Sequence, residues 1–296
     1  MITRNTLVIS AMLLAAVFLG LATASAAEPA EGCDRKCLRG FVTKYLDAMI
    51  AHKPEAALPL APGARFTEDC KEMKVGEGLW KSISGLTDYR RDILDAQQGV
   101  AVSFLVVEEN TSPVLYVVRL KIADNKITEI ETTAVRNKAE GMLFNTANLK
   151  TVSKTMTEPV EKAQRNTREE MIKMALTYPA GLKVGSFVKV DSPMAPDAYR
   201  FENGQLMAGP GCTFFQGCDN MKTQRIPTLP EITHRVMAVD EELGVVAVRM
   251  NFGRGSTFEG DGVLDVWHSF KIYGGQIHAA EAYCEIVRAG TKSGWE

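Results

Sequence analysis

The last part of the sequence contains the pair of side chains best suited to acid–base chemistry. Gly274-Gly275 is typical of the two-residue turn of a β-hairpin, so Tyr273 should lie opposite Gln276. Counting back from that turn places His268 directly opposite Glu281. Cross-strand Cβ atoms lie about 5 Å apart, which allows a hydrogen bond between the two side chains. A carboxylate fixes the tautomer of a histidine and raises its basicity, so this pair is our candidate catalytic base.

Other side chains are candidates for binding a substrate near this pair: Tyr283, Phe270, Arg249, Tyr199 and Glu202. Arg249 interrupts an apolar segment and could hold an anion, although an arginine whose head group reaches solvent from an outer face is the simpler interpretation. Tyr199 could equally belong to the core. Glu202 comes just before Asn203-Gly204, which is typical of a turn, and could lie at the rim of a pocket.

The two halves of the chain repeat each other. Residues 117–131 read VVRLKIADNKITEIE and residues 267–281 read WHSFKIYGGQIHAAE. A lysine, two isoleucines and the final glutamate, at 121, 122, 127 and 131, recur 150 positions later. Upstream segments match at offsets of 145 and 134, as insertions in loops of the second copy would produce. A period this long indicates a duplicated domain.

The hairpin of the first copy lacks the histidine. With Asp124-Asn125 as its turn, the same counting places Glu131 opposite Val118, so only the carboxylate is repeated. Any catalysis is therefore expected in the second copy. The alternative is a buried His–Glu pair without a catalytic role, and a register shift of one residue would separate the two side chains.

Each copy has a helix followed by strands. A helix should follow Asp34 in the first copy, and another should begin at Thr167, where Glu170 completes a capping box, and stop before Pro179. The expected strands are residues 100–107, 114–122 and 127–135, then 232–239, 245–252, 263–272 and 277–287. This order predicts an α+β fold. The predicted domains are residues 27–136 and 167–296, joined by a polar connector at 137–166.

This pattern resembles the SnoaL-like, nuclear-transport-factor-like cone, and more closely a two-cone family of largely uncharacterised secreted or fungal proteins, a domain of unknown function. The motifs that carry the resemblance are RFTE (65–68), GEGLW (76–80), RLKI (119–122), ITEIE (127–131), AQR (163–165), REE (168–170), RFENG (200–204), VDEELG (239–244) and SGW (293–295). The resemblance implies two tandem cones, each a helical layer on a bent antiparallel sheet with a conical pocket between them. Related cones include isomerases, dehydratases, lyases, epoxide hydrolases and proteins that only bind. Ala198 and Cys70 depart from the family pattern, so the disulfides could differ here.

The N-terminus is typical of a cleaved secretory signal. Arg4 precedes an apolar run at residues 7–21, and Ala24-Ser25-Ala26 provides a cleavage site after Ala26. The run is shorter than the roughly 20 residues of a membrane span. We therefore expect a periplasmic or secreted protein with a signal peptide at residues 1–26.

Cysteines in an oxidising compartment usually form disulfides. Cys212 and Cys218 flank a short loop and are a plausible pair, whereas Cys33 could pair with Cys37 or with Cys70. Cys284 could be a free, buried thiol. The sequence has no C-x-x-C motif and its histidines are not at ligand spacing, so no metal site is expected.

Composition and motifs narrow the function. A formal charge of −2 argues against a nucleic-acid-binding protein, and no dinucleotide, phosphate-loop or serine-hydrolase motif is present. We expect an acid/base enzyme without a cofactor, of lyase, dehydratase or isomerase type, acting on a small, mostly apolar molecule in the second cone. The alternative is a non-catalytic ligand-binding or assembly protein of the same fold. The expected partners are a small molecule and no membrane after signal cleavage, and the two cones should pack as an internal pseudo-dimer.

Overall fold

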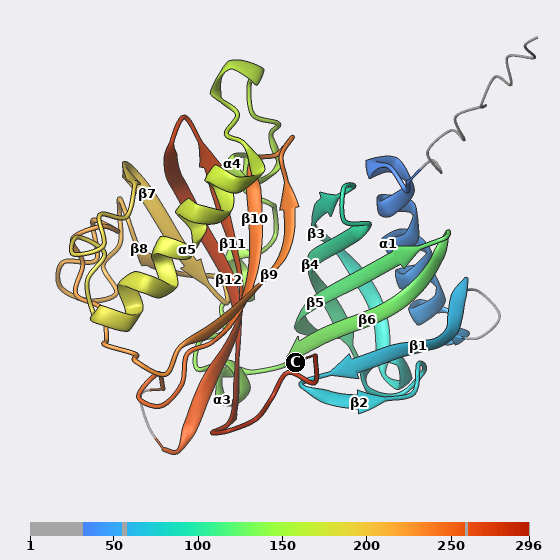
Figure 1. Ribbon diagram of the computed structural model, residues 1–296. Coiled ribbons are helices and arrows are strands. Elements are labelled where there is room, and N and C mark those ends of the chain that lie inside the picture. Colours follow the sequence, from blue (N-terminus) through green and yellow to red (C-terminus); the bar gives the residue numbers. More distant parts are fainter. Residues whose placement is uncertain (1–31, 55–57, 258–259, 296) are drawn as a thin grey trace, which may run out of the picture. The chain divides into compact units, whose positions relative to one another are not determined.

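The computed structural model describes residues 32–54, 58–257 and 260–295 (Figure 1). The predicted signal at residues 1–26 lies outside the described residues. Of the helices in these ranges, none has both the length and the apolar character needed to cross a membrane.

The first half of the described chain is a helix and a six-stranded sheet. Its elements are α1 (Arg35–Ile50), β1 (Leu60–Glu68), β2 (Lys71–Met73), a 3-10 turn at Gly78–Lys81, β3 (Ile83–Asp95), β4 (Val100–Glu109), β5 (Ser112–Ala123) and β6 (Lys126–Val135). The strand order is β2-β1-β6-β5-β4-β3, and α1 packs against β3 and β4.

The second half is likewise a helix and a six-stranded sheet. Its elements are α5 (Arg168–Val184), β7 (Met194–Glu202), β8 (Gln205–Ala208), β9 (Thr233–Asp240), β10 (Val245–Asn251), β11 (Gly262–Tyr273) and β12 (Gln276–Arg288). The strand order β8-β7-β12-β11-β10-β9 repeats that of the first half, and α5 packs against β9 and β10. Short helices α3 (Lys138–Gly141) and α4 (Lys154–Thr157) and 3-10 turns at Thr146–Asn148 and Lys162–Gln164 lie between the halves in sequence.

These two helix-and-sheet halves confirm the predicted α+β class. The sheets are not wholly antiparallel, because β1 pairs with β6, and β7 with β12, in parallel. A parallel pair needs a long crossover connection, and in each half the chain between these strands supplies it.

Helix α5 begins as predicted and ends later than predicted. Thr167 and Glu170 form the expected capping box. The helix then continues through Pro179 and stops at Gly185, which has a left-handed φ of 69°. Proline removes one helical hydrogen bond, but Tyr178 and Leu182 on either side of it are buried in the core. Their burial offsets the missing bond.

Apolar side chains form a core inside each half and a further cluster that contains residues of both sheets. The contacts around this shared cluster are reciprocal. Asp95 accepts hydrogen bonds from the backbone of Val239 (2.9 Å) and from Arg168, while Asp240 accepts from the backbone of Leu94 (2.9 Å) and from Arg35. Asp95 and Asp240 are 145 positions apart, which is the offset at which the neighbouring segments of the two copies match.

Two disulfides are present. Cys33 is joined to Cys37 and Cys212 to Cys218, with Cα–Cα distances of 5.2 and 5.6 Å. Cys70, the other partner considered for Cys33, is a free thiol, as is the buried Cys284.

Candidate functional site

The final hairpin does not have the register that its turn predicts. Tyr273 pairs with Gln276 as expected, but the register then shifts, so that Lys271 lies opposite Ala279. The extra residue is His278, whose ring stacks on that of Tyr273 at 3.5 Å between centroids. This β-bulge moves His268 opposite Ala282 and sends its side chain to the other face of the sheet from Glu281.

The same shift occurs in the first half. There Lys121 lies opposite Glu129, so Glu131 faces Arg119 and not Val118. Both copies therefore correct the prediction in the same way. A bulge after the second residue pair of this hairpin belongs to the repeated fold.

His268 lies in an apolar enclosure. It is fully buried, and its ring lies 4.8 Å from Tyr178, 5.2 Å from Phe270 and 6.2 Å from Phe252, measured between centroids. Its two ring nitrogens have no hydrogen-bond partner among the described residues. Burial, and secondarily the charge of Arg200, lower the pKa of His268 well below its usual value. The predicted His268–Glu281 dyad is therefore not formed, and His268 is a neutral core residue.

This environment predicts a pH dependence that His268→Phe should remove. The imidazole stays neutral in the folded protein, whereas the unfolded chain binds a proton below about pH 6.5, so His268 costs stability as the pH falls. Between pH 7 and pH 5 its share of the loss should be about 2 kcal/mol. Urea unfolding of the wild type and the variant at both pH values measures it, with His234→Phe, an exposed residue, as the control. An equal pH slope in wild type and His268→Phe would contradict the neutral, unpartnered state.

The structure divides the other predicted site residues between the two faces of the second sheet. Phe270 packs beside His268, and Glu202 lies on the same side, 3.1 Å from Arg200. Tyr199, Glu281, Tyr283 and Arg249 lie on the other side. There the hydroxyl of Tyr199 donates to Glu281 at 3.1 Å.

The interior of the first half contains a buried acid, Glu68, that was not among the predicted site residues. Glu68 is 2% exposed, and burial raises its pKa to about 7. It accepts a hydrogen bond from the backbone of Leu79 at 2.9 Å. A Cβ at Gly78 would clash with the carboxylate of Glu68, so the acid occupies the space that the glycine leaves. We interpret Glu68 as a packed core residue.

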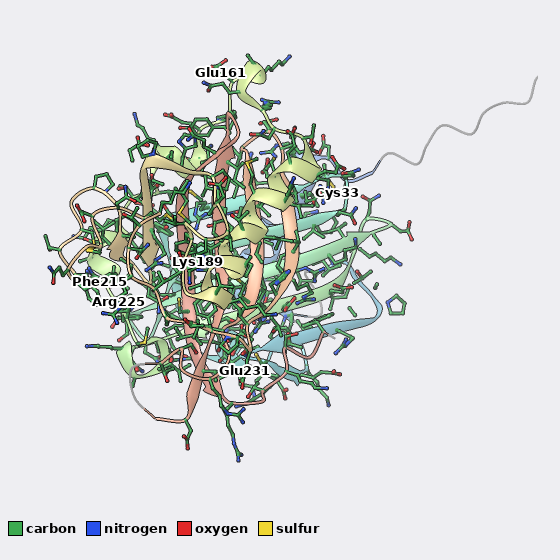
Figure 2. All side chains as sticks on the ribbon, turned by 60° about the vertical axis from the view of Figure 1, so that its left-hand side comes forward. Cys33, Glu161, Lys189, Phe215, Arg225 and Glu231 are labelled. Carbon is green, nitrogen blue, oxygen red and sulfur yellow. A yellow bond between two sulfur atoms is a disulfide. The ribbon has the colours of Figure 1, made fainter. Side chains whose placement is uncertain are left out.

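A cavity of about 580 Å³ lies on the face of the second sheet that is opposite to His268, and we call it the Arg249 cavity. Its wall comes from β9, β10, β11 and residues 289–295, and it includes Thr233, His234, Arg235, Arg249, Asp265 and Lys292. Glu231, labelled in Figure 2, also lines it and pairs with Arg254 at 3.3 Å.

Arg249 is a buried charge with a complete set of partners. It is 3% exposed, and it donates to Asp265 at 2.7 Å, to Glu131 of β6 at 2.6 Å and to the sulfur of Cys70 at 2.9 Å. Burial acts to lower the pKa of Arg249, but Asp265, Cys70 and Glu131 together raise it above its usual value. The guanidinium group therefore stays charged inside the protein.

The duplication shows what the fold requires at this place. The strand registers make Arg249, Asp265 and Glu285 the counterparts of Phe104, Leu115 and Val135, which are fully buried apolar residues. The repeated fold is thus satisfied by an apolar set. A buried set of charges there is generally no more stable than an apolar one, so its presence in one copy indicates a role other than stability.

Cys70, Asp265 and Glu285 have the composition of a metal site, with ligand atoms within 4.8 Å of one another. Arg249 already contacts Asp265 and Cys70, and it lies 3.5 Å from Glu285. A metal ion would be repelled by this guanidinium group at short range. The cation of this cluster is therefore the arginine.

The C-terminal segment closes one side of the cavity and is fixed to the first half. The indole of Trp295 donates to the hydroxyl of Thr67 at 2.8 Å. The guanidinium group of Arg65 lies 4.4 Å from the Trp295 ring and donates to the carbonyl of Gly294 at 2.7 Å. Two motifs from opposite ends of the sequence, residues 65–68 and 293–295, therefore meet beside the cavity.

Arg249 was a predicted site residue, but its partners Glu131, Asp265, Glu285 and Cys70 were not. The signal that could have found them is the repeat itself. Aligning the two copies strand by strand shows apolar residues replaced by charged ones at matching positions.

Part of the chain is similar to a family of sequences and to solved structures. Residues 164–284 match the family described as "Domain of unknown function (DUF8021)". Among curated proteins, none shows significant sequence similarity to the chain.

Two solved structures are similar to part of the chain. An NTF2-like protein of unknown function from Cytophaga hutchinsonii ATCC 33406 is 11% identical, and the match covers 34% of this chain and 91% of that protein with a TM-score of 0.28. An NTF2-like protein of unknown function from Shewanella baltica OS155 is 14% identical, and the match covers 40% of this chain and 98% of that protein with a TM-score of 0.27.

Proposed function

We propose that this protein binds a small molecule in the Arg249 cavity without transforming it. The observation that carries the proposal is the replacement of Phe104, Leu115 and Val135 by a buried, charged set beside a cavity of about 580 Å³. Ligand pockets commonly have volumes of roughly 300–1,000 Å³. In our proposal this charged set holds the cavity wall in the geometry that a ligand needs.

The location of the pocket differs from the one expected at first. An enzyme of the second cone would need a base in its interior, and His268 lacks the carboxylate partner that this chemistry requires. The face that carries Glu281, Tyr199 and Arg249 is turned toward the first half. The two halves together, in our proposal, act as an internal pseudo-dimer that holds the cavity wall in place.

We also propose that the protein works outside the cytoplasm. The charged N-terminus, apolar run and small residues before Ala27 support export, and two disulfides suit an oxidising compartment. The ligand would then be a molecule that is present in the periplasm or outside the cell.

Native mass spectrometry of the protein from its own host tests this function. We expect a mature chain that begins at Ala27 and carries a bound small molecule. Ala289 lines the cavity, so the indole of Ala289→Trp should occupy it and remove the ligand. Ala123→Trp, an exposed change in the first half, should leave the ligand bound.

A second pair of variants distinguishes the two possible pockets. His268→Phe changes the interior of the second half and should leave the ligand bound. If His268→Phe releases the ligand and Ala289→Trp retains it, the ligand lies in the second cone and the proposal is wrong.

A further inference from the structure

We infer that the ligand of the Arg249 cavity carries an anionic group, a carboxylate or a phosphate, which Arg235 and Lys292 recognise. This inference rests on the proposed function and adds the chemical class of the ligand. It follows from which polar groups of the cavity wall are already paired within the protein and which are not.

Arg235 has donors to spare. Its Nη2 donates to Glu131, while Nε and Nη1 have no partner among the described residues. The side chain is 34% exposed and lines the cavity. Nε and Nη1 point in different directions, and each can donate one charge-assisted hydrogen bond to an oxygen of a carboxylate or phosphate.

Lys292 and His234 also line the cavity, and neither has a partner among the described residues. Both are exposed, so they can turn toward a ligand without losing a contact in the protein. Lys292 brings a positive charge from the C-terminal segment, on a different element from Arg235. An anion between these elements would meet donors from both.

The acids near the cavity already pair with arginines of the protein. Asp265 and Glu131 accept from Arg249, and Glu231 pairs with Arg254. Of the charged residues that line the cavity, Arg235, Arg249, Arg254 and Lys292 outnumber Glu231 and Asp265. Glu131 and Glu285, which also pair with Arg249, bring the acids to four, equal to the cations, but these acids have partners whereas Lys292 has none among the described residues. The unpaired polar groups at the mouth are therefore mainly donors, which favours an anionic ligand over a cationic one.

Calorimetric titration of the mature protein can test the class with simple probes. Benzoate and benzamide have nearly the same shape and differ in charge, and inorganic phosphate tests the other anion. We expect benzoate or phosphate to bind at least about tenfold more tightly than benzamide, and the affinity to fall as salt increases.

Lys292→Glu is the sharpest variant, because this side chain has no partner in the described structure and its replacement should not disturb folding. It should weaken binding of the anionic probe about tenfold, and Arg235→Gln should do the same. Arg225→Gln, an exposed change outside the cavity wall, is the control and should have no effect. Because Arg235 also pairs with Glu131, urea unfolding must show that Arg235→Gln is folded.

The outcomes separate this inference from the proposed function. Equal binding of benzoate and benzamide, binding of neither anion, or unchanged binding by Lys292→Glu would overturn the anionic class. If the natural ligand is still displaced by Ala289→Trp in that case, the cavity remains the binding site for a neutral molecule. If Ala289→Trp has no effect on the natural ligand, the proposed function itself is wrong.

Discussion

Replacing Glu131 by alanine is expected to lower the free energy of unfolding by about 3–5 kcal/mol. Glu131 is fully buried and lies 2.6 Å from Arg249, with Arg235 and Arg119 as further partners. Removal of the carboxylate leaves the buried guanidinium group of Arg249 with less compensation and leaves Arg235 without its partner in the first half. Both changes penalise the folded state, since a charge without a partner is costly in a region that water does not reach.

Glu129→Ala is the matched control. Glu129 also pairs with Arg119, at 2.6 Å, but its side chain is 33% exposed, so its loss should cost less than about 1 kcal/mol. Urea unfolding followed by circular dichroism measures both variants. A loss for Glu131→Ala no larger than that for Glu129→Ala would show that the cluster does not depend on this carboxylate.

The charged pairs between the halves follow the repeat, and this explains why Glu131 has so many partners. Arg91 lies 3.5 Å from Glu281, and Arg235 contacts Glu131, so each half contributes one arginine and one acid of the same type. The second half then adds Arg249 where the first has Phe104. The two pairs that both halves share, Arg91–Glu281 and Arg235–Glu131, are suited to holding the two sheets together. Arg249 has no charged counterpart in the first half. The asymmetry is therefore the part of the interface that assembly alone does not explain.

The sequence predicted β4–β6 and β9–β12 well because their signals are local, and it missed β1–β3, β7 and β8. The strands around Asp124-Asn125 and Gly274-Gly275 are apolar, are bounded by turn residues and match across the copies. Strand β1 escaped prediction because Pro62 and Gly63 interrupt it, and its place in the sheet depends on pairing with the distant β6. Tertiary pairing decides such a strand, and no local pattern reveals it.

The candidate site was predicted less well, for a related reason. The register count from Gly274-Gly275 was right for two residue pairs and wrong after the bulge at His278. A bulge depends on twist and on packing of the strand, so a turn motif does not reveal it. One residue of shift was enough to separate His268 from Glu281, and it also placed Glu281 among charged residues of the other half.

Asn203→Ala is the second change expected to have a large effect. Asn203 is fully buried, with a left-handed φ of 46°, and its amide group donates to the carbonyls of Gly141, Leu143 and Cys284 at 2.8–3.0 Å. Its side-chain oxygen accepts from the backbone of Cys284 at 2.8 Å. This one side chain joins the turn after β7 to β12 and to the segment after α3.

Alanine at this position would leave a buried N–H and several carbonyls without partners and would also adopt a left-handed backbone less readily than asparagine. At about 1–3 kcal/mol for each group that stays unsatisfied, we expect a loss of about 3–4 kcal/mol. Asn110→Ala is the matched control, because Asn110 is exposed and has a left-handed φ of 49°, so it isolates the backbone contribution at about 1 kcal/mol. Urea unfolding of the two variants gives the difference, and equal losses would mean that the hydrogen bonds of Asn203 are replaced by water.

In the first half Asp69 accepts from the backbone of Ala134 at 2.9 Å in the equivalent place, so the accepting oxygen is the repeated feature and the three donated bonds belong to the second half. Asn203→Asp should therefore keep the bond from Cys284 and lose the link to the segment after α3.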